Sequence, residues 1–339
     1  MRAAMYYAND DVRIVDLPKP KIGPGEILVK VRSSGICGSD VMEWYRKPKA
    51  PLVLGHEIAA EVVEVGTGVN RVKIGDRVFV SHHVPCGECR YCFAGHETVC
   101  DTLRTTNVDP GGFAEFVRVP AINVRNGVVT LPETLSDEEA VFIEPLACVV
   151  RGQRLAELRP ASTVLVIGNG IAGLLHIKVA KLIGAKRIFA TDIVEYRLKA
   201  AKKMGADTTI DGHGDVPARV REANHDDLVD YVITCTGSSN AISQGLASVN
   251  RGGTVLLFAP VSPGTKVEFP LNSLWRDEAK VVSSYAAGQQ DIQKSIEILT
   301  HRRINVTDLV SHVLRLSDAA EAFRIVAAAG NSLKVVLRP

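Results

Sequence analysis

The hydrophobic pattern of this 339-residue chain changes character near its middle. Before residue 145, short runs rich in valine and isoleucine are separated by Gly and Pro turns; these runs cover residues 26–32, 58–65 and 76–80. Short runs of this composition, bounded by turn residues, predict β-strands. We therefore expect this part of the chain to form a small antiparallel barrel or sandwich.

From about residue 160, apolar strands alternate with amphipathic helices. Residues 163–167 are wholly apolar, as expected of a parallel strand that is buried on both faces. Helices are predicted over 171–183 and 196–204, the second ending at Gly205, a typical C-terminal cap. Further strands are predicted at 187–191, 228–235 and 254–259. Strands that alternate with helices predict an α/β fold with a doubly wound parallel sheet.

Length and pattern together predict two domains. Residues 146–287 carry the strand–helix alternation. The last fifty or so residues return to a mixed pattern, so 288–339 are expected to join 1–145 in one β-rich domain.

Charge and composition narrow the class of function. The net charge is +2, which argues against nucleic-acid binding. The one local basic group, at Lys199, Lys202 and Lys203, lies on a predicted helix and is interpreted as a solvated face. No apolar run reaches the roughly 18 residues that span a bilayer, and the first residues lack the apolar segment of a signal peptide. Seven cysteines do not suggest a secreted disulfide framework. These observations predict a cytoplasmic protein that does not bind membranes.

Four of the cysteines lie within fifteen residues, spaced C-x2-C-x2-C-x7-C at Cys86, Cys89, Cys92 and Cys100. Four thiolates this close in sequence can surround one tetrahedral Zn²⁺ and leave no open position, which predicts a structural ion. A disulfide pair and four unrelated thiols are the alternatives, and disulfides are disfavoured in a reducing compartment.

The segment Gly168-Asn169-Gly170-Ile171-Ala172-Gly173 has the form G-x-G-x-x-G. It leaves a predicted buried strand and opens a predicted helix, which is the context that a dinucleotide site requires. Gly168 permits the turn, Gly170 admits a pyrophosphate near the helix start at Ile171, and Gly173 lets helix and strand pack closely. An ordinary strand–helix turn is the alternative.

Asp192 ends the next predicted strand, nineteen residues after Gly173. A carboxylate there accepts the ribose hydroxyls of NAD and repels the 2′-phosphate of NADP, so NAD is the predicted cofactor. A helix N-cap is the alternative role for Asp192. Arg197, five residues further on, is a second candidate for contact with the adenosine ribose.

A second set of possible metal ligands is spread along the chain. Cys37, His56, Glu57 and Glu144 offer one thiolate, one imidazole and two carboxylates, which suits a catalytic zinc with one exchangeable position. Asp40 is placed to orient His56. A buried cysteine, a core histidine and surface acids are the alternatives, and spacing alone does not choose between them.

These motifs, taken together and in this order, resemble the zinc-dependent medium-chain dehydrogenases. The matching segments are CGSD at 37–40, GHE at 55–57, GDRV at 75–78, the four-cysteine loop, EPL at 144–146, the glycine turn and TD at 191–192. The glutamate of EPL resembles the sorbitol (L-iditol 2-) dehydrogenase branch, whereas threonine dehydrogenases tend to carry an aspartate there. The resemblance covers the whole chain.

The resemblance implies a GroES-like catalytic domain, a Rossmann domain and a site between them. It implies that Cys37, His56 and either Glu57 or Glu144 bind a catalytic zinc, and that Ser39 takes the substrate proton. Relatives carry a histidine five residues after the ligand cysteine. Met42 stands there in this chain, so a water path or Glu43 is expected to replace that relay.

The expected reaction is hydride transfer from a secondary alcohol of a polyol to NAD, with two zinc ions per chain. An L-threonine 3-dehydrogenase or another alcohol dehydrogenase with the same fold is the alternative enzyme. A non-enzymatic zinc-ribbon binding protein is the alternative from a different class. Relatives are commonly dimers or tetramers, which predicts a homo-oligomer.

Overall fold

A computed structural model describes all 339 residues, which divide into two compact units. One unit comprises Met1–Ala147 and Ala287–Pro339, and the other comprises Cys148–Ala286. The chain therefore leaves the first unit once and returns to it. Helix α6, Ile143–Leu155, contains the boundary between the two units.

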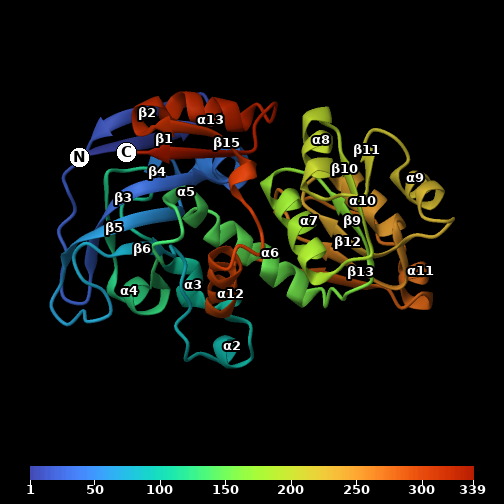
Figure 1. The fold of residues 1–339 in the computed structure, drawn as a ribbon, viewed down its shortest axis with the longest axis horizontal. Helices are drawn as coiled ribbons and strands as arrows, with labels where there is room; N and C mark the ends of the chain where they lie inside the picture. The colour runs from blue at the N-terminus through green and yellow to red at the C-terminus, as the bar shows by residue number, and fades with distance from the viewer. The chain divides into compact units, whose positions relative to one another are not determined.

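The first unit is built on β-sheets. A seven-stranded sheet has the order β15-β16-β3-β5-β6-β8, with β7 also paired to β3, and a three-stranded sheet has the order β2-β1-β4 (Figure 1). The strands are β1 Arg2–Ala8, β2 Asp11–Asp16, β3 Ile27–Ile36, β4 Leu52–Val53, β5 Glu57–Val65, β6 Arg77–Val80, β7 Phe116–Val119, β8 Val128–Thr130, β15 Val310–Arg315 and β16 Lys334–Arg338.

The helices of this unit are short apart from α12 and α13. They are α1 Glu43–Arg46, α2 Arg90–Phe93, α3 Asp101–Thr105, α4 Ala121–Gly127, α5 Asp137–Ala140, α12 Gln289–Thr300 and α13 Ala319–Ala327. Two apolar clusters hold the unit together. One includes Val29, Ile58 and Val78 inside the large sheet, and the other packs Phe323 of α13 against Tyr6 of β1.

The second unit has a single parallel sheet of six strands in the order β11-β10-β9-β12-β13-β14. Numbered from β9, this order is 3-2-1-4-5-6, that of a doubly wound dinucleotide-binding fold. The strands are β9 Thr163–Ile167, β10 Arg187–Asp192, β11 Thr208–Asp211, β12 Val229–Thr234, β13 Val249–Leu257 and β14 Lys280–Ser283. The structure thus confirms the predicted α/β class.

Helices connect these strands: α7 Ile171–Ile183, α8 Glu195–Met204, α9 Val216–Ala223, α10 Ser239–Ala247 and α11 Leu271–Arg276 (Figure 1). Gly184 and Gly205 end α7 and α8 in the left-handed conformation, with φ of 97° and 118°. A side chain at either position would strain the backbone, so the glycines fix where both helices stop.

Strand β13 departs from the expected 254–259. It begins at Val249, where Val249 pairs with Val229, and the register then shifts so that Thr254 pairs with Tyr231. The Gly252-Gly253 pair conceals this strand in the sequence, because glycine is unfavourable in regular strands and marks irregularities in them.

Candidate active site

The four clustered cysteines lie on a loop between β6 and β7. The Sγ atoms of Cys86 and Cys92 are 3.9 Å apart, those of Cys89 and Cys92 are 3.6 Å apart, and those of Cys86 and Cys100 are 3.6 Å apart. Tetrahedral Zn–S bonds of about 2.3 Å place sulfurs roughly 3.8 Å from one another. All seven cysteines are free thiols. The four sulfurs therefore fit one zinc ion and form no disulfide.

Short helices help to bring the four cysteine sulfurs together. Cys89 precedes α2 and Cys100 precedes α3. Burial raises the pKa of the Cys100 thiol, but backbone hydrogen bonds from Cys86 and Leu103 outweigh burial and lower that pKa to about 6. Burial raises the pKa of the Cys92 thiol to about 12, so the four thiols differ widely in how readily they ionise. The loop is also tied to α12, because Gln289 N donates to Glu97 Oε2 at 3.2 Å.

A second group of possible metal ligands gathers at the end of β3. The ligand atoms of Cys37, His56 and Glu57 all lie within 4.8 Å of one another. The antiparallel pairing of Gly35 with Glu57 brings the end of β3 beside the start of β5. A Cβ atom on Gly35 would lie 1.9 Å from Glu57 Oε2, so this approach requires glycine. The set supplies three ligands of types that zinc accepts.

Asp40 lies beside the imidazole ring of His56. Its side chain is fully buried, and Oδ1 lies 3.4 Å from His56 Nδ1. Oδ2 accepts a hydrogen bond from Cys37 N at 3.1 Å. Burial raises the pKa of Asp40, but His56, Arg46 and the Cys37 amide lower it below the ordinary value. Asp40 therefore faces His56 as a carboxylate, which orients a ligand histidine.

A buried lysine that the sequence analysis missed lies against the same group. Lys334 Nζ is 2.7 Å from both carboxylate oxygens of Glu57 and donates to Ile36 O at 3.2 Å. Burial lowers the pKa of Lys334, but Glu57, Cys37 and Glu144 raise it above its ordinary value. The only sequence signal was a lysine inside the apolar run LKVVL at 333–337.

Glu144 stands at the start of α6 and is half-buried. It is outside the three-residue ligand group, although its charge acts on Lys334. The structure therefore brings Glu57, and not Glu144, within 4.8 Å of the other two ligands.

Two histidines that follow β6 approach His56. The rings of His56 and His82 have centroids 4.8 Å apart, and those of His82 and His83 are 3.9 Å apart. Burial and the nearby positive groups lower the pKa of His83 to about 4. His83 is therefore neutral near pH 7 and offers hydrogen bonds without charge. The sequence analysis did not place His82 here, because a pair of histidines carries no ligand spacing.

Ser39 lies in the 3₁₀ turn Gly38–Val41 that follows Cys37. Arg46 Nη2 donates to Ser39 Oγ at 3.2 Å. Glu43 is engaged elsewhere: it accepts from Asn9 N at 3.2 Å and from Lys47 Nζ at 3.3 Å. The side chain that contacts Ser39 is thus Arg46, and the expectation of a relay by a water path or by Glu43 stays a prediction.

The glycine turn in the second unit has the features of an anion site. Gly168 has a φ of +87°, and a Cβ on Gly173 would lie 2.0 Å from Gly168 O. A Cβ on Gly170 would meet nothing within 4 Å, so the chain is open to solvent there. Helix α7 begins at Ile171, and the first amides of a helix lack intrahelical acceptors and suit an anion.

Asp192 closes the other side of the turn. Its Oδ2 accepts from Asn169 N at 2.6 Å and its Oδ1 from Val194 N at 2.9 Å. The carboxylate is thereby fixed beside the glycine turn, with lone pairs left for further donors. Arg197 lies in the first turns of α8, and its buried Nε has no hydrogen-bond partner. A carboxylate at the end of the second strand stands where dinucleotide folds bind the adenosine ribose.

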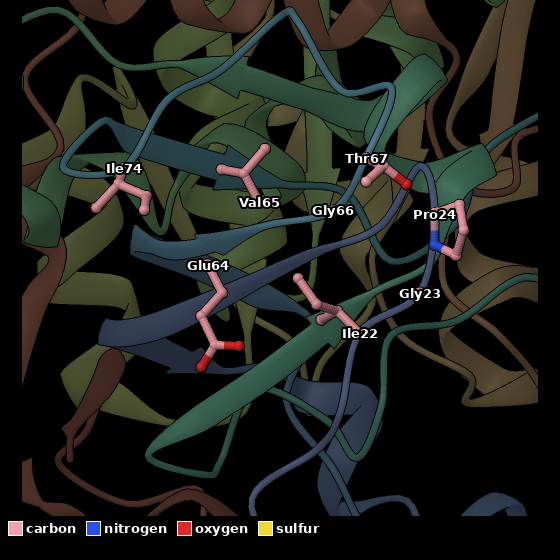
Figure 2. A pocket seen from close by; sticks show the side chains of 8 residues that line it. All are labelled: Ile22, Gly23, Pro24, Glu64, Val65, Gly66, Thr67 and Ile74. Carbon is pink, nitrogen blue, oxygen red and sulfur yellow. The ribbon is translucent and has the colours of Figure 1, made fainter.

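Two cavities lie away from these residues. One of about 540 Å³ is lined by the segment before β3, the end of β5 and the loop after β5, including Ile22, Glu64 and Ile74 (Figure 2). Glu64 is already paired there with Lys19 at 2.6 Å. Another of about 290 Å³ lies in the second unit near Asn224 and Asp230. Neither is lined by a candidate ligand, so the chemistry is assigned from the side-chain groups.

No helix of the structure combines the length and apolar character needed to cross a bilayer.

Comparison with protein families gives two matches. Residues 23–133 match the alcohol dehydrogenase GroES-like domain, and residues 172–301 match the zinc-binding dehydrogenase domain. The chain is 32% identical to a sorbitol dehydrogenase from Bacillus subtilis (strain 168), over 100% of this chain and 97% of that protein. It is 36% identical to an L-threonine 3-dehydrogenase from Pyrococcus furiosus, over 95% of this chain and 93% of that protein.

Solved structures have the same fold. A zinc-binding dehydrogenase from Sinorhizobium meliloti 1021 bound to NADP has a TM-score of 0.89 and 29% identity, covering 100% of this chain and 99% of that one. A short chain alcohol dehydrogenase from E. coli CFT073 complexed with NADH has a TM-score of 0.89 and 28% identity, with the same coverage.

Proposed function

Because this chain belongs to the zinc-dependent medium-chain dehydrogenases and is an alcohol or polyol dehydrogenase, we propose that it transfers a hydride from a secondary alcohol of a polyol to NAD. The observation that carries the proposal is the group of Cys37, His56 and Glu57 ligand atoms within 4.8 Å of one another. A zinc ion bound there would act as a Lewis acid and lower the pKa of the substrate hydroxyl.

Each candidate residue of the site has a proposed role. Cys37, His56 and Glu57 hold the ion, and Asp40 orients His56. Ser39 accepts the proton of the substrate hydroxyl and passes its own proton to water. Glu144 is the carboxylate that replaces Glu57 at the ion, or acts on it through water, during turnover. The approach of Glu57 to Cys37 and His56 supports this order, since Glu144 lies outside the group.

The proposed cofactor is NAD. Asp192 is held by two backbone amides beside the glycine turn, where its negative charge favours ribose hydroxyls over a 2′-phosphate. Gly170 and the helix start at Ile171 receive the pyrophosphate, Gly168 and Gly173 shape the turn that holds it, and Arg197 contacts the adenosine ribose. NADP is the alternative, because a similar dehydrogenase from S. meliloti is bound to it.

The proposed zinc content is two ions per chain, the second held by the four cysteines of the 86–100 loop. Their sulfur–sulfur distances support a closed tetrahedral site.

L-threonine is the second candidate substrate, on the strength of the 36% identity to the P. furiosus enzyme. The discriminating experiment is NADH formation by the purified protein with sorbitol, xylitol, other polyols, inositols and L-threonine, each with NAD and with NADP. Polyol oxidation with NAD supports the proposal. Turnover of L-threonine alone would replace the proposed substrate, and turnover of none of the alcohols would overturn the function.

We also propose that the protein is a cytoplasmic homo-oligomer, either a dimer or a tetramer. Seven free thiols suit a reducing compartment. Strand β14 pairs only with β13, and Leu271 and Trp275 of the neighbouring α11 are 73% and 80% exposed. An open strand edge beside large apolar side chains favours pairing with a second copy. Light scattering on the purified protein measures the assembly directly.

A further inference from the structure

Arg46 hydrogen-bonds to Ser39 in a chain that has Met42 in place of the relay histidine. Met42 cannot exchange protons, and Arg46 is the residue whose side chain contacts Ser39. Its Nε donates to Ser39 O at 3.0 Å, and its Nη2 donates to Ser39 Oγ at 3.2 Å and to Asp40 Oδ1 at 3.0 Å. One guanidinium thus spans the backbone and hydroxyl of Ser39 and the carboxylate behind His56.

The surroundings fix this guanidinium in place. The Arg46 side chain is 13% exposed and that of Asp40 is 0% exposed. The guanidinium also lies 4.5 Å from the centre of the Tyr45 ring. Helix α1 is only one turn long and ends at Arg46, so the side chain turns back over the residues that precede the helix. A buried, forked contact of this kind is rigid and strongly oriented.

The chemistry of arginine limits what the contact does. A guanidinium has only donors and stays protonated in proteins. It therefore takes one lone pair of Ser39 Oγ, and the hydroxyl proton must point away from it. The remaining lone pair is free to accept the proton of a substrate alcohol. The positive charge of the Arg46 guanidinium beside Ser39 Oγ also favours transfer of the Ser39 hydroxyl proton to water.

We propose that Arg46 is a positioning residue that orients the Ser39 hydroxyl for proton transfer, a role that rests on the proposed alcohol oxidation. In that reaction the substrate O–H bond breaks and its proton goes to Ser39 Oγ, while the Ser39 proton goes to water. The carbon–hydrogen bond breaks with its electron pair, which reduces NAD⁺ to NADH as the alcohol becomes a ketone. Arg46 neither gains nor loses a proton.

A purely structural role is the competing explanation, because Arg46 also pairs with Asp40 and could merely stabilise His56. The two roles differ in their dependence on the Ser39 hydroxyl. A residue that acts through Ser39 loses its effect when that hydroxyl is absent. A residue that acts through Asp40 keeps its effect in either background.

The test is a double-mutant cycle with Arg46→Met and Ser39→Ala, assayed with NAD and the best alcohol of the panel. In the wild-type background Arg46→Met should lower kcat about 10- to 100-fold, the range for loss of a partner that orients an active-site group, and leave the KM for NAD unchanged. In the Ser39→Ala background the same change should alter kcat less than about 2-fold. Zinc content should stay the same in all four proteins.

Two further variants complete the design. Lys47→Met is the matched control, since this neighbouring cation pairs with Glu43 and does not contact Ser39; its kcat should equal that of the wild type. Arg46→Lys keeps the charge without the fork, so it should retain an intermediate kcat, and it replaces Arg46→Met in the cycle if that variant does not fold.

An unchanged kcat in Arg46→Met would overturn the inference. So would an equal loss in both backgrounds, or a loss of zinc from the Cys37 site, because either result assigns Arg46 to the support of Asp40. If the wild-type protein oxidises none of the alcohols, the proposed function fails before the cycle begins.

Discussion

Lys334 Nζ lies 2.7 Å from both carboxylate oxygens of Glu57, and both side chains are buried. The two residues are 277 positions apart and meet because β16 pairs with β3, where Val335 faces Ile36. The ammonium balances one negative charge beside the candidate zinc ligands. The ammonium of Lys334 therefore affects how strongly the Glu57 carboxylate binds an ion.

Replacing Lys334 should show how much its ammonium group contributes to the free energy of unfolding. When no ion is bound at this site, Lys334→Met leaves Glu57 buried without a partner, and removing one member of a buried pair costs about 3–5 kcal/mol. We expect the free energy of unfolding of the protein without an ion at this site to fall by that amount, measured by chemical denaturation. The double variant Lys334→Met with Glu57→Gln should recover part of the loss, because no isolated charge remains. A Lys334→Met protein as stable as the wild type would contradict the role of this pair.

The four-cysteine loop predicts a metal-dependent stability. Cys89→Ser should reduce the zinc content from two ions per chain to one and lower the melting temperature, since a three-thiolate site holds zinc less well. Elemental analysis and thermal unfolding measure both effects. Cys148→Ala is the control, because its thiol lies outside both ligand groups. Unchanged zinc content in Cys89→Ser would remove this loop from the metal sites.

The contacts of Asp192 predict a change in cofactor selectivity. Asp192→Ala removes both the acceptor for ribose hydroxyls and the charge that repels a 2′-phosphate. The KM for NAD should rise about tenfold or more, from the loss of hydrogen bonds to a charged group, while the KM for NADP should fall. Steady-state kinetics with both cofactors gives the ratio. Glu195→Gln serves as the control, because Glu195 is 79% exposed and paired with Lys199. An unaltered ratio would exclude Asp192 from the ribose site.

Buried His176 predicts a loss of stability in acid. It lies in α7 with its ring packed at 90° against Phe258, and burial lowers its pKa to about 3. The unfolded chain binds a proton below about pH 6.5 and the folded one does not, so stability must fall as the pH drops from 6.5 toward 3. At pH 5 this group should cost about 2 kcal/mol.

The comparison of wild type with His176→Gln isolates that contribution. Chemical unfolding between pH 7 and pH 5 should show a steeper fall for the wild type, because the variant has no proton to bind. His213→Gln is the control, since His213 is largely exposed. Parallel curves for wild type and His176→Gln would show that His176 does not remain neutral in the folded protein.

Local patterns predicted much of this protein. The glycine turn and the four-cysteine loop each lie within fifteen residues, so spacing alone indicates their chemistry. The strand at 163–167 and the helix at 171–183 have the predicted bounds, because apolar periodicity and a left-handed glycine at Gly184 define them. Boundaries failed where tertiary pairing extends a strand through glycines, as at Gly252-Gly253 in β13.

The residues that contact the candidate site could not be predicted from the sequence. Lys334 and Arg46 carry no motif, and each reaches the site through packing: one by strand pairing across the sheet, the other by a one-turn helix that folds its side chain back. The same holds for His82, whose ring lies beside His56. Side chains that meet in this way are recognisable only once the backbone is placed.

The pairing of Lys334 with Glu57 also orders events during synthesis. The four cysteines that suit a structural ion are all present once residue 100 has left the ribosome, and they can close on zinc while most of the chain is still being made. The reactive centre must wait for a counter-charge encoded 277 residues after Glu57. A nascent chain that binds zinc at these four cysteines would therefore do so long before Glu57 has its counter-charge.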